Sequence, residues 1–284
     1  MAMTINTNLQ SLNAQRNLGA SQSSLSTSMQ RLSSGLRVNS AKDDAAGLSI
    51  AERMNAQVRG MNVAVRNAND GVSMAQTAEG ALSKVSDSLQ RMRELTVQAR
   101  NGTNGAKDQE SLDKEFQELA KEITRVIGGA DFNGKKILSG DAGDIAFQVG
   151  ANTTDNDVIT ISTTDLSGDA TITAVTSGKI MGADSTTEAT ADELKEVIDN
   201  IDIALDTVNS QRAVLGASQN RFESVIANLQ VASENTAAAR SRITDADFAS
   251  ETANLSRSQI LQQAGTAMVA QANQLPQGVL SLLR

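Results

Sequence analysis

Two stretches of the chain carry apolar residues at a strict seven-residue spacing. In the first, from Met54 to Met92, every seventh residue is apolar and a second apolar stripe follows four residues behind. Steps of four and three place both stripes on one face of a helix, and a sustained seven-residue repeat is typical of a coiled coil. We predict that this buried face contains Met54, Val58, Met61, Val65, Val72, Leu82 and Leu89.

The second stretch runs from Leu194 to Leu229 and has the same spacing. At ~1.5 Å per residue, each helix would span roughly 60 Å. Two matched stripes in one chain predict a long antiparallel coiled-coil rod built from both ends, although two helices of an ordinary bundle remain an alternative. The predicted core residues on this side are Leu194, Ile198, Ile201, Leu205, Val208, Leu215, Phe222, Ile226 and Leu229.

Both companion stripes contain polar residues. Glu79 and Ser86 interrupt the first stripe, where Val85 and Met92 lie one position aside, and the second stripe is broken by Arg212 and Gln219. The first helix also contains three glycines, each of which lowers helix propensity by roughly 1 kcal/mol relative to alanine. We interpret these glycines as positions of close approach to neighbouring elements: Gly60, Gly71 and Gly80.

The segments around the predicted rod have recognisable boundaries. Ser40–Asp43 resembles a capping box that opens the first long helix, which ends near Arg100, and Thr190–Glu193 opens the second. A turn at 101–105 precedes a return helix over 112–126, and a break at 243–247 precedes a last helix over about 248–274, which Pro276 should loosen or end. Alternating residues predict three short strands in a glycine-rich module, at 144–149, 158–163 and 170–175.

The two ends of the chain contain apolar residues but almost no charge. Residues 1–42 and 252–284 contain no acid, so all 33 acidic residues lie between them. We expect these ends to be largely disordered in the free chain and to become buried against other chains. The apolar residues concerned are Ile5, Leu9, Leu12, Leu25, Met29, Leu32, Leu36, Leu255, Ile260, Met268, Leu275, Val279, Leu282 and Leu283.

The composition excludes several classes of function. The chain has no histidine and no cysteine, so it lacks the usual general bases, thiol nucleophiles and transition-metal ligands. We therefore predict no enzyme activity, no cofactor and no metal. Four aspartates of the module, Asp155, Asp157, Asp165 and Asp169, do not match a calcium-binding loop and are interpreted as loop acids.

The acidic middle of the chain argues against nucleic acid as a partner. No apolar run is long enough for a transmembrane helix, so membrane insertion is not expected. The first residues, MAMTINTNLQ, have neither the basic nor the apolar region of a secretory signal. An extracellular role would therefore need a dedicated export machine.

Several segments resemble bacterial flagellin. They include LSSGLRVNSAKDDAAGLSIAERM (32–54), NANDGVSMAQTAEGAL (67–82), QRMRELTVQARNGTN (90–104), FNGKKIL (132–138) and FQVGAN (147–152). The C-terminal half adds LGASQNRFESVIANL (215–229), ARSRITDADFASET (239–252) and QILQQAGTAMVAQANQLPQGVLSLLR (259–284). The resemblance covers about residues 1–150 and 190–284, whereas residues 151–189 contribute nothing to it.

The resemblance implies a structural subunit of the extracellular flagellar filament. It implies export through the flagellar type III apparatus, homopolymerisation into a helical filament, an export chaperone on the C-terminal segment, and cap and hook–filament junction proteins as neighbours. It also implies recognition by the innate flagellin receptor, whose contacts carry over to Arg91, Leu95 and Glu115. Filament contacts or solvated rod positions are an equal alternative for these three residues.

The resemblance also implies a division of the chain into five parts. These are an N-terminal polymerisation segment (1–42), two halves of the rod (43–140 and 190–242), a short β-rich surface region (141–189) and a C-terminal polymerisation segment (243–284). A hook–filament junction protein has similar ends and is the main alternative. A peptidase-bearing flagellin would need an H-E-x-x-H motif, which a chain without histidine cannot supply. A surface adhesion or signalling role for 151–189 stays open.

Overall fold

The computed structural model describes residues 7–182 and 188–281, with side chains up to Gln274. The fold is mainly α, with long helices from both ends of the chain and a small antiparallel β-hairpin module in the middle, as predicted. The elements are α1 (Leu9–Ser34), α2 (Ala45–Ala99), α3 (Ala106–Gly129), β1 (Asp131–Phe132), β2 (Lys135–Lys136), β3 (Asp144–Gln148), the 3₁₀ turn η1 (Asp155–Asp157), β4 (Val158–Ser162), α4 (Ala170–Thr176), α5 (Ala191–Thr244) and α6 (Phe248–Ser281).

The chain divides into two compact units. The middle unit is Val58–Ser233, and the terminal unit contains Met1–Gln57 and Glu234–Arg284, as far as these are described. The helices α2 and α5 contribute to both units. Each unit is described separately below.

In the middle unit, α2 and α5 run antiparallel. Asn62 of α2 contacts Ser233 of α5, with 3.4 Å between Oδ1 and Oγ. Further along α2, the Arg93 guanidinium donates to the Asp202 carboxylate at 2.6 Å. Residue numbers thus rise along α2 as they fall along α5, which is the arrangement that the matched seven-residue stripes predict.

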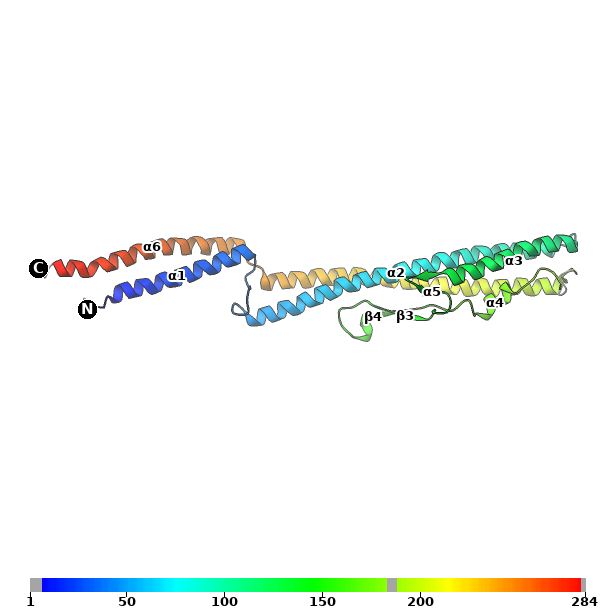
Figure 1. The fold of residues 1–284 in the computed structure, drawn as a ribbon, viewed down its shortest axis with the longest axis horizontal. Coiled ribbons are helices and arrows are strands. Elements are labelled where there is room, and N and C mark those ends of the chain that lie inside the picture. Colours follow the sequence, from blue (N-terminus) through cyan, green and yellow to red (C-terminus); the bar gives the residue numbers. More distant parts are fainter. Residues whose placement is uncertain (1–6, 183–187, 282–284) are drawn as a thin grey trace. The chain divides into compact units, whose positions relative to one another are not determined.

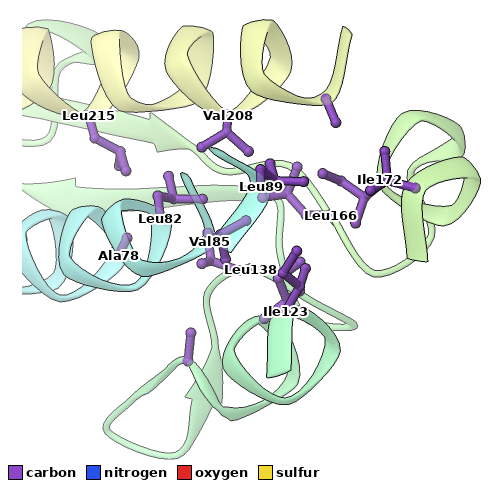
Figure 2. Packing of buried hydrophobic residues seen from close by; sticks show 14 of the residues in the cluster. Ala78, Leu82, Val85, Leu89, Ile123, Leu138, Leu166, Ile172, Val208 and Leu215 are labelled. Carbon is purple, nitrogen blue, oxygen red and sulfur yellow. The ribbon is translucent and has the colours of Figure 1, made fainter. Parts of the chain in front are cut away.

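A third layer covers one side of this helix pair. The amphipathic helix α3 buries Phe116, Ile123 and Ile127, and these join α2 and α5 in one apolar cluster. Figure 2 shows Val208 and Leu215 of α5 pointing towards α2, and Val85 on the side of α2 near Ile123. This layer explains why Val85 and Met92, one position outside the predicted stripe, are completely buried.

The β-rich module packs on the rod through the inner face of a two-stranded sheet. β3 and β4 pair antiparallel, with Ile145 opposite Ile161 and Phe147 opposite Ile159. Burial alternates along both strands, so one face lies against the helices and the other is exposed. The ring of Phe147 makes an edge-on contact with Phe222 of α5, with 5.6 Å between the ring centroids.

The third predicted strand is wrong, because residues 170–175 belong to the helix α4. The Asp169 carboxylate accepts a hydrogen bond from the Thr171 N–H and caps this helix. Ile172 and Val175, three residues apart, are both buried, as the helical period requires. The alternation of threonine and apolar residues in ATITAV therefore gave a misleading period.

Most helix ends lie where the sequence places them. Thr190 and Glu193 form the predicted reciprocal cap, in which the Glu193 carboxylate accepts from the Thr190 N–H at 2.7 Å. At α2, the Asp43 carboxylate closes a turn on Ser40, but the helix itself is capped one residue later, where Asp44 accepts from the Gly47 N–H. The break at 243–247 is confirmed.

Pro276 was expected to loosen or end the last helix; it does not end it, because α6 continues through it to Ser281. Proline fixes φ near the helical value, so it does not by itself force the chain out of the helix. It removes one N–H donor and thus one hydrogen bond, which a long helix can lose without ending.

In the terminal unit, α1 and α6 lie side by side and antiparallel (Figure 1). The Asn8 side-chain amide donates to the Ala272 carbonyl at 2.7 Å, and Arg31 lies 4.0 Å from Glu251. α1 ends at Gly35, whose φ of 71° lies in the left-handed region that favours glycine. The two ends that we expected to be disordered in the free chain are therefore helices that pack against each other.

Candidate functional surfaces

The contact between α1 and α6 is built from small residues. Of the residues in α1, only Ser11 and Ser28 are buried. On α6, four residues at seven-residue spacing line the same contact: Glu251, Ser258, Gly265 and Ala272. A Cβ added to Gly265 would lie 3.1 Å from Cδ1 of Leu18, so the two helices approach closely there. This stripe was not predicted, and its signal is the seven-residue spacing of the three small residues Ser258, Gly265 and Ala272, continued at Glu251.

Several large apolar side chains of both helices are exposed outside this contact, although Leu18 lies within it. Leu9 is 70% exposed, Met29 57%, Ile260 66% and Met268 60%, and Leu12 is also exposed. Leu25, Leu32, Leu36 and Leu255 are half-buried. In most helix pairs the large apolar side chains are inside and the small polar ones outside. Here small polar residues are buried while several large apolar side chains are exposed, so these helices present an apolar outer surface.

A shallow groove of about 210 Å³ runs between the two helices. Leu18 and Ser21 line it from α1, and Leu261, Gly265 and Met268 line it from α6. Leu261 is half exposed and was not among the predicted surface residues. Five other predicted residues are not part of this surface as described: Ile5, Leu282 and Leu283 lie outside the described residues, and the side chains of Leu275 and Val279 are not described.

The predicted rod residues lie on the inner faces of α2 and α5. The buried ones are Met61, Leu82, Leu89, Leu194, Ile201, Val208, Leu215 and Phe222. The half-buried ones are Met54, Val58, Val65, Val72, Ile198, Leu205, Ile226 and Leu229. Apolar burial thus follows the stripes along both helices, and it is most complete where the third layer covers the pair.

The three residues carried over as receptor contacts lie close together but differ in exposure. The Arg91 guanidinium on α2 lies 2.8 Å from the Glu115 carboxylate on α3, and 3.0 Å from Glu94. The hydrogen bonds that the Arg91 guanidinium donates to the Glu115 carboxylate, followed by that to Glu94, raise the pKa of Arg91. About half of the Arg91 and Glu115 side-chain surface is accessible.

Leu95 differs from the other two because it is only 1% exposed and belongs to the apolar cluster. A receptor that docks on this structure would have no surface of Leu95 to contact. The carried-over role of Leu95 is therefore corrected: in this structure it is a core residue that supports the helix carrying Arg91.

Within the described ranges, no group of three or more acidic residues could hold a metal ion. The module aspartates instead accept hydrogen bonds from their own turns. Asp157 is bonded to Thr154 and Asp165 to Ser167, and these bonds lower the pKa of both carboxyl groups. Asp169 caps α4.

No helix in the described part of the chain combines the length and the apolar character needed to cross a membrane.

Comparison with known proteins identifies the family. Residues 5–142 match the model of the bacterial flagellin N-terminal helical region, and residues 198–283 match that of the bacterial flagellin C-terminal helical region. The flagellin of Halalkalibacterium halodurans is 48% identical over 282 residues, covering 99% of this chain and all of the relative. That of Bacillus subtilis is 42% identical over 306 residues, with 99% and 100% covered.

A crystal structure of Bacillus cereus flagellin aligns with 58% of this chain and 88% of its own, at 31% identity and a TM-score of 0.48. Two family models together match most of the chain. The relatives have nearly the same length and match this chain along almost all of it. The chain belongs to the bacterial flagellin family, and it is a structural subunit of the flagellar filament.

Proposed function

We propose that the outer faces of α1 and α6 are the surfaces through which copies of this chain polymerise. The observation that carries this proposal is the apolar outer surface of the two helices. The fully buried positions of α1 are serines, whereas Leu9, Leu12, Met29, Ile260, Leu261 and Met268 are exposed. An open helical polymer needs heterologous contacts that each copy offers again to the next. An apolar surface on two long helices provides such contacts.

Burial of this surface in a polymer would also stabilise the terminal helices. Among the described residues, each helix packs mainly on the other, and helices draw most of their stability from tertiary packing. Removing apolar surface from water contributes roughly 25 cal/mol per Å². We propose that α1 and α6 reach their stable packing when neighbouring copies cover them. Before assembly, this would leave the ends loosely held and suited to passage through an export channel.

The same ends support a proposed export route and set of partners. As in the family, the chain would leave the cell through the flagellar type III apparatus, with an export chaperone covering the C-terminal segment. Ile260, Leu261 and Met268 of α6 are exposed apolar side chains that such a chaperone could shield. At the two ends of the filament, the cap and the hook–filament junction proteins would contact the same helices.

Recognition by the innate flagellin receptor is a second proposal, centred on Arg91 and Glu115. Both are exposed and ion-paired, so they offer a fixed pattern of charge on the surface of α2 and α3. Leu95 contributes indirectly, as a buried support.

A charge on the terminal surface tests the polymerisation proposal. We expect the variant Ile260→Asp to keep its helix content and melting temperature, because the side chain is 66% exposed, and to stop growing on filament seeds. The control is Thr160→Asp, on the exposed face of β4, which should still extend the seeds. Normal filaments from Ile260→Asp, seen by electron microscopy, would contradict the proposal.

A truncation separates this proposal from a general loss of folding. Removing residues 1–30 or 255–284 should leave a soluble helical rod, because the apolar cluster lies entirely in the middle unit. Such a rod should not polymerise. If the full chain were a hook–filament junction protein, it would instead form a thin collar on the seeds and then stop growing.

A further inference from the structure

Three of the four polar residues that interrupt the two companion stripes meet each other in the structure. The Gln219 side-chain amide of α5 donates to Oε2 of Glu79 on α2 at 3.0 Å. Arg212, one heptad before Gln219, places Nη2 3.9 Å from Oε1 of the same carboxylate. Just over a third of the Glu79 and Arg212 side-chain surface is accessible, and Nε of Arg212 is buried without a hydrogen-bond partner among the described residues. A half-buried polar layer therefore crosses an otherwise apolar seam.

Contacts on both sides of this layer show that the pairing is continuous. Asn62 contacts Ser233 and Arg93 contacts Asp202, so 31 residues on α2 match 31 residues on α5. Between these two contacts the register neither slips nor bulges. Glu79 consequently falls midway between two positions of α5 that are seven residues apart, where it reaches both partners.

The apolar stripes alone do not define this register. Because they repeat every seven residues, sliding α5 by one heptad, about 10 Å, leaves most apolar positions facing apolar positions. Such a slip disrupts the polar layer, because Glu79 loses one of its two partners. In one direction Glu79 would exchange Gln219 for Leu205, and in the other it would exchange Arg212 for Ile226. Either shift leaves a half-buried carboxylate beside an aliphatic side chain, which is unfavourable.

We propose that Glu79, Arg212 and Gln219 act as a register lock that selects one antiparallel alignment of α2 and α5. A polar residue inside a coiled coil can specify register at some cost in stability. Such a device is useful here because about ninety residues separate the two helices along the chain, so no tight turn fixes their alignment. The unpartnered Nε of Arg212 is consistent with that cost.

The register can be read directly by disulfide crosslinking, since the chain has no cysteine of its own. The pair Asn62→Cys with Ser233→Cys reports the native register. The pairs Asn69→Cys with Ser233→Cys, and Arg93→Cys with Lys195→Cys, report a slip of one heptad in each direction. A slipped pair cannot close in the native register, because its Cα atoms would be about 10 Å apart along the rod.

In the full chain with its native polar layer, only the Asn62–Ser233 pair should crosslink. In the apolar variant E79L/R212L/Q219L, we expect crosslinks of one or both slipped pairs to appear, while the melting temperature stays the same or rises. The charge-reversed variant E79R/R212E keeps a polar layer at the same level and should again crosslink only the native pair. If the apolar variant does not fold, E79M/R212M carries the same expectation, because methionine adapts to irregular packing.

Two outcomes would overturn the proposal. Exclusive native crosslinking in the apolar variants would mean that the β-rich module sets the register, through contacts such as Asn67 with the Gln148 carbonyl and Gln211 with Thr164. Slipped crosslinks in the charge-reversed variant would mean that the polar layer does not select the register. Neither outcome depends on polymerisation, so this test can fail while the proposed assembly surface holds.

Discussion

Phe222 of α5 packs directly against the backbone of Gly71 in α2. A Cβ added at position 71 would lie 2.7 Å from Cζ of the Phe222 ring, closer than any real contact. The ring is completely buried, and it also makes an edge-on contact with Phe147 of β3. The smallest residue on one helix thus makes room for the largest on the other, at the point where the module joins the rod.

We expect Gly71→Ala to destabilise the middle unit by about 1–3 kcal/mol, the usual cost of overpacking, in spite of alanine's better helix propensity. The ring cannot move away freely because it is completely buried and packs against Phe147. The measurement is thermal or denaturant unfolding followed by circular dichroism.

Gly80 provides the matched control for Gly71 in the same helix. Nothing lies within 4 Å of a Cβ added there, so Gly80→Ala should stabilise the chain by up to about 1 kcal/mol. Equal effects of the two substitutions would show that the contact with Phe222 has no energetic weight.

These glycines illustrate what the sequence can and cannot predict. Close approach was expected at three glycines and occurs at two of them, Gly60 and Gly71. A Cβ added at Gly60 would clash with Ala151, whereas one added at Gly80 would meet open space. A glycine lowers helix propensity wherever it lies, but only its neighbours in space show whether the missing side chain is needed. Those neighbours come from segments distant in the chain.

The long helices were predictable because a coiled coil uses the same local period along its whole length. The short β-rich region between the rod helices was less predictable. The strands at 144–149 and 158–163 were correct, but α4 was missed because Thr and Ile also alternate there. Leu95 shows a further limit: its segment resembles a receptor-contact motif, and only the packing of α3 decides that this side chain is buried.

Buried charge gives a second prediction, at Leu215. This side chain is 2% exposed and points into the core, so Leu215→Asp places an unpaired carboxylate among apolar groups. We expect a loss of several kcal/mol in the free energy of unfolding. The neighbouring Val214 is 42% exposed, and Val214→Asp should change stability by about 0.5 kcal/mol or less. Unchanged melting of Leu215→Asp would mean that this face is not buried.

Receptor signalling gives a third prediction, at Arg91. Exposed ion pairs contribute little to stability, so Arg91→Ala should leave the melting temperature nearly unchanged. If the receptor proposal is correct, the same variant should lower the signal in cells that carry the innate flagellin receptor. Arg93 is the control, because it is on the same helix, about equally exposed, and paired with Asp202. Equal loss of signal in Arg91→Ala and Arg93→Ala would argue against a specific role for Arg91.

Acid stability gives the last prediction, because several carboxylates accept hydrogen bonds that hold their turns and helix ends together. The Ser40 N–H, followed by that of Asn39, lowers the pKa of Asp43 below its ordinary value of 3.8. The Thr190 N–H lowers that of Glu193 below 4.5, and the Ser241 hydroxyl lowers that of Asp245. Such groups bind fewer protons in the folded chain than in the unfolded one, so their contribution is complete above the unfolded pKa.

The melting temperature should therefore be nearly constant from neutral pH down to about 5, and should fall as the pH drops through 4.5 and then 3.8 towards the lower folded values. Glu193→Gln removes the titrating group from the cap of α5. Its melting temperature should be lower at neutral pH, and the difference from the native chain should shrink as the pH falls, because the native cap is then protonated as well. A constant difference across the titration would show that ionisation of Glu193 does not stabilise the helix end.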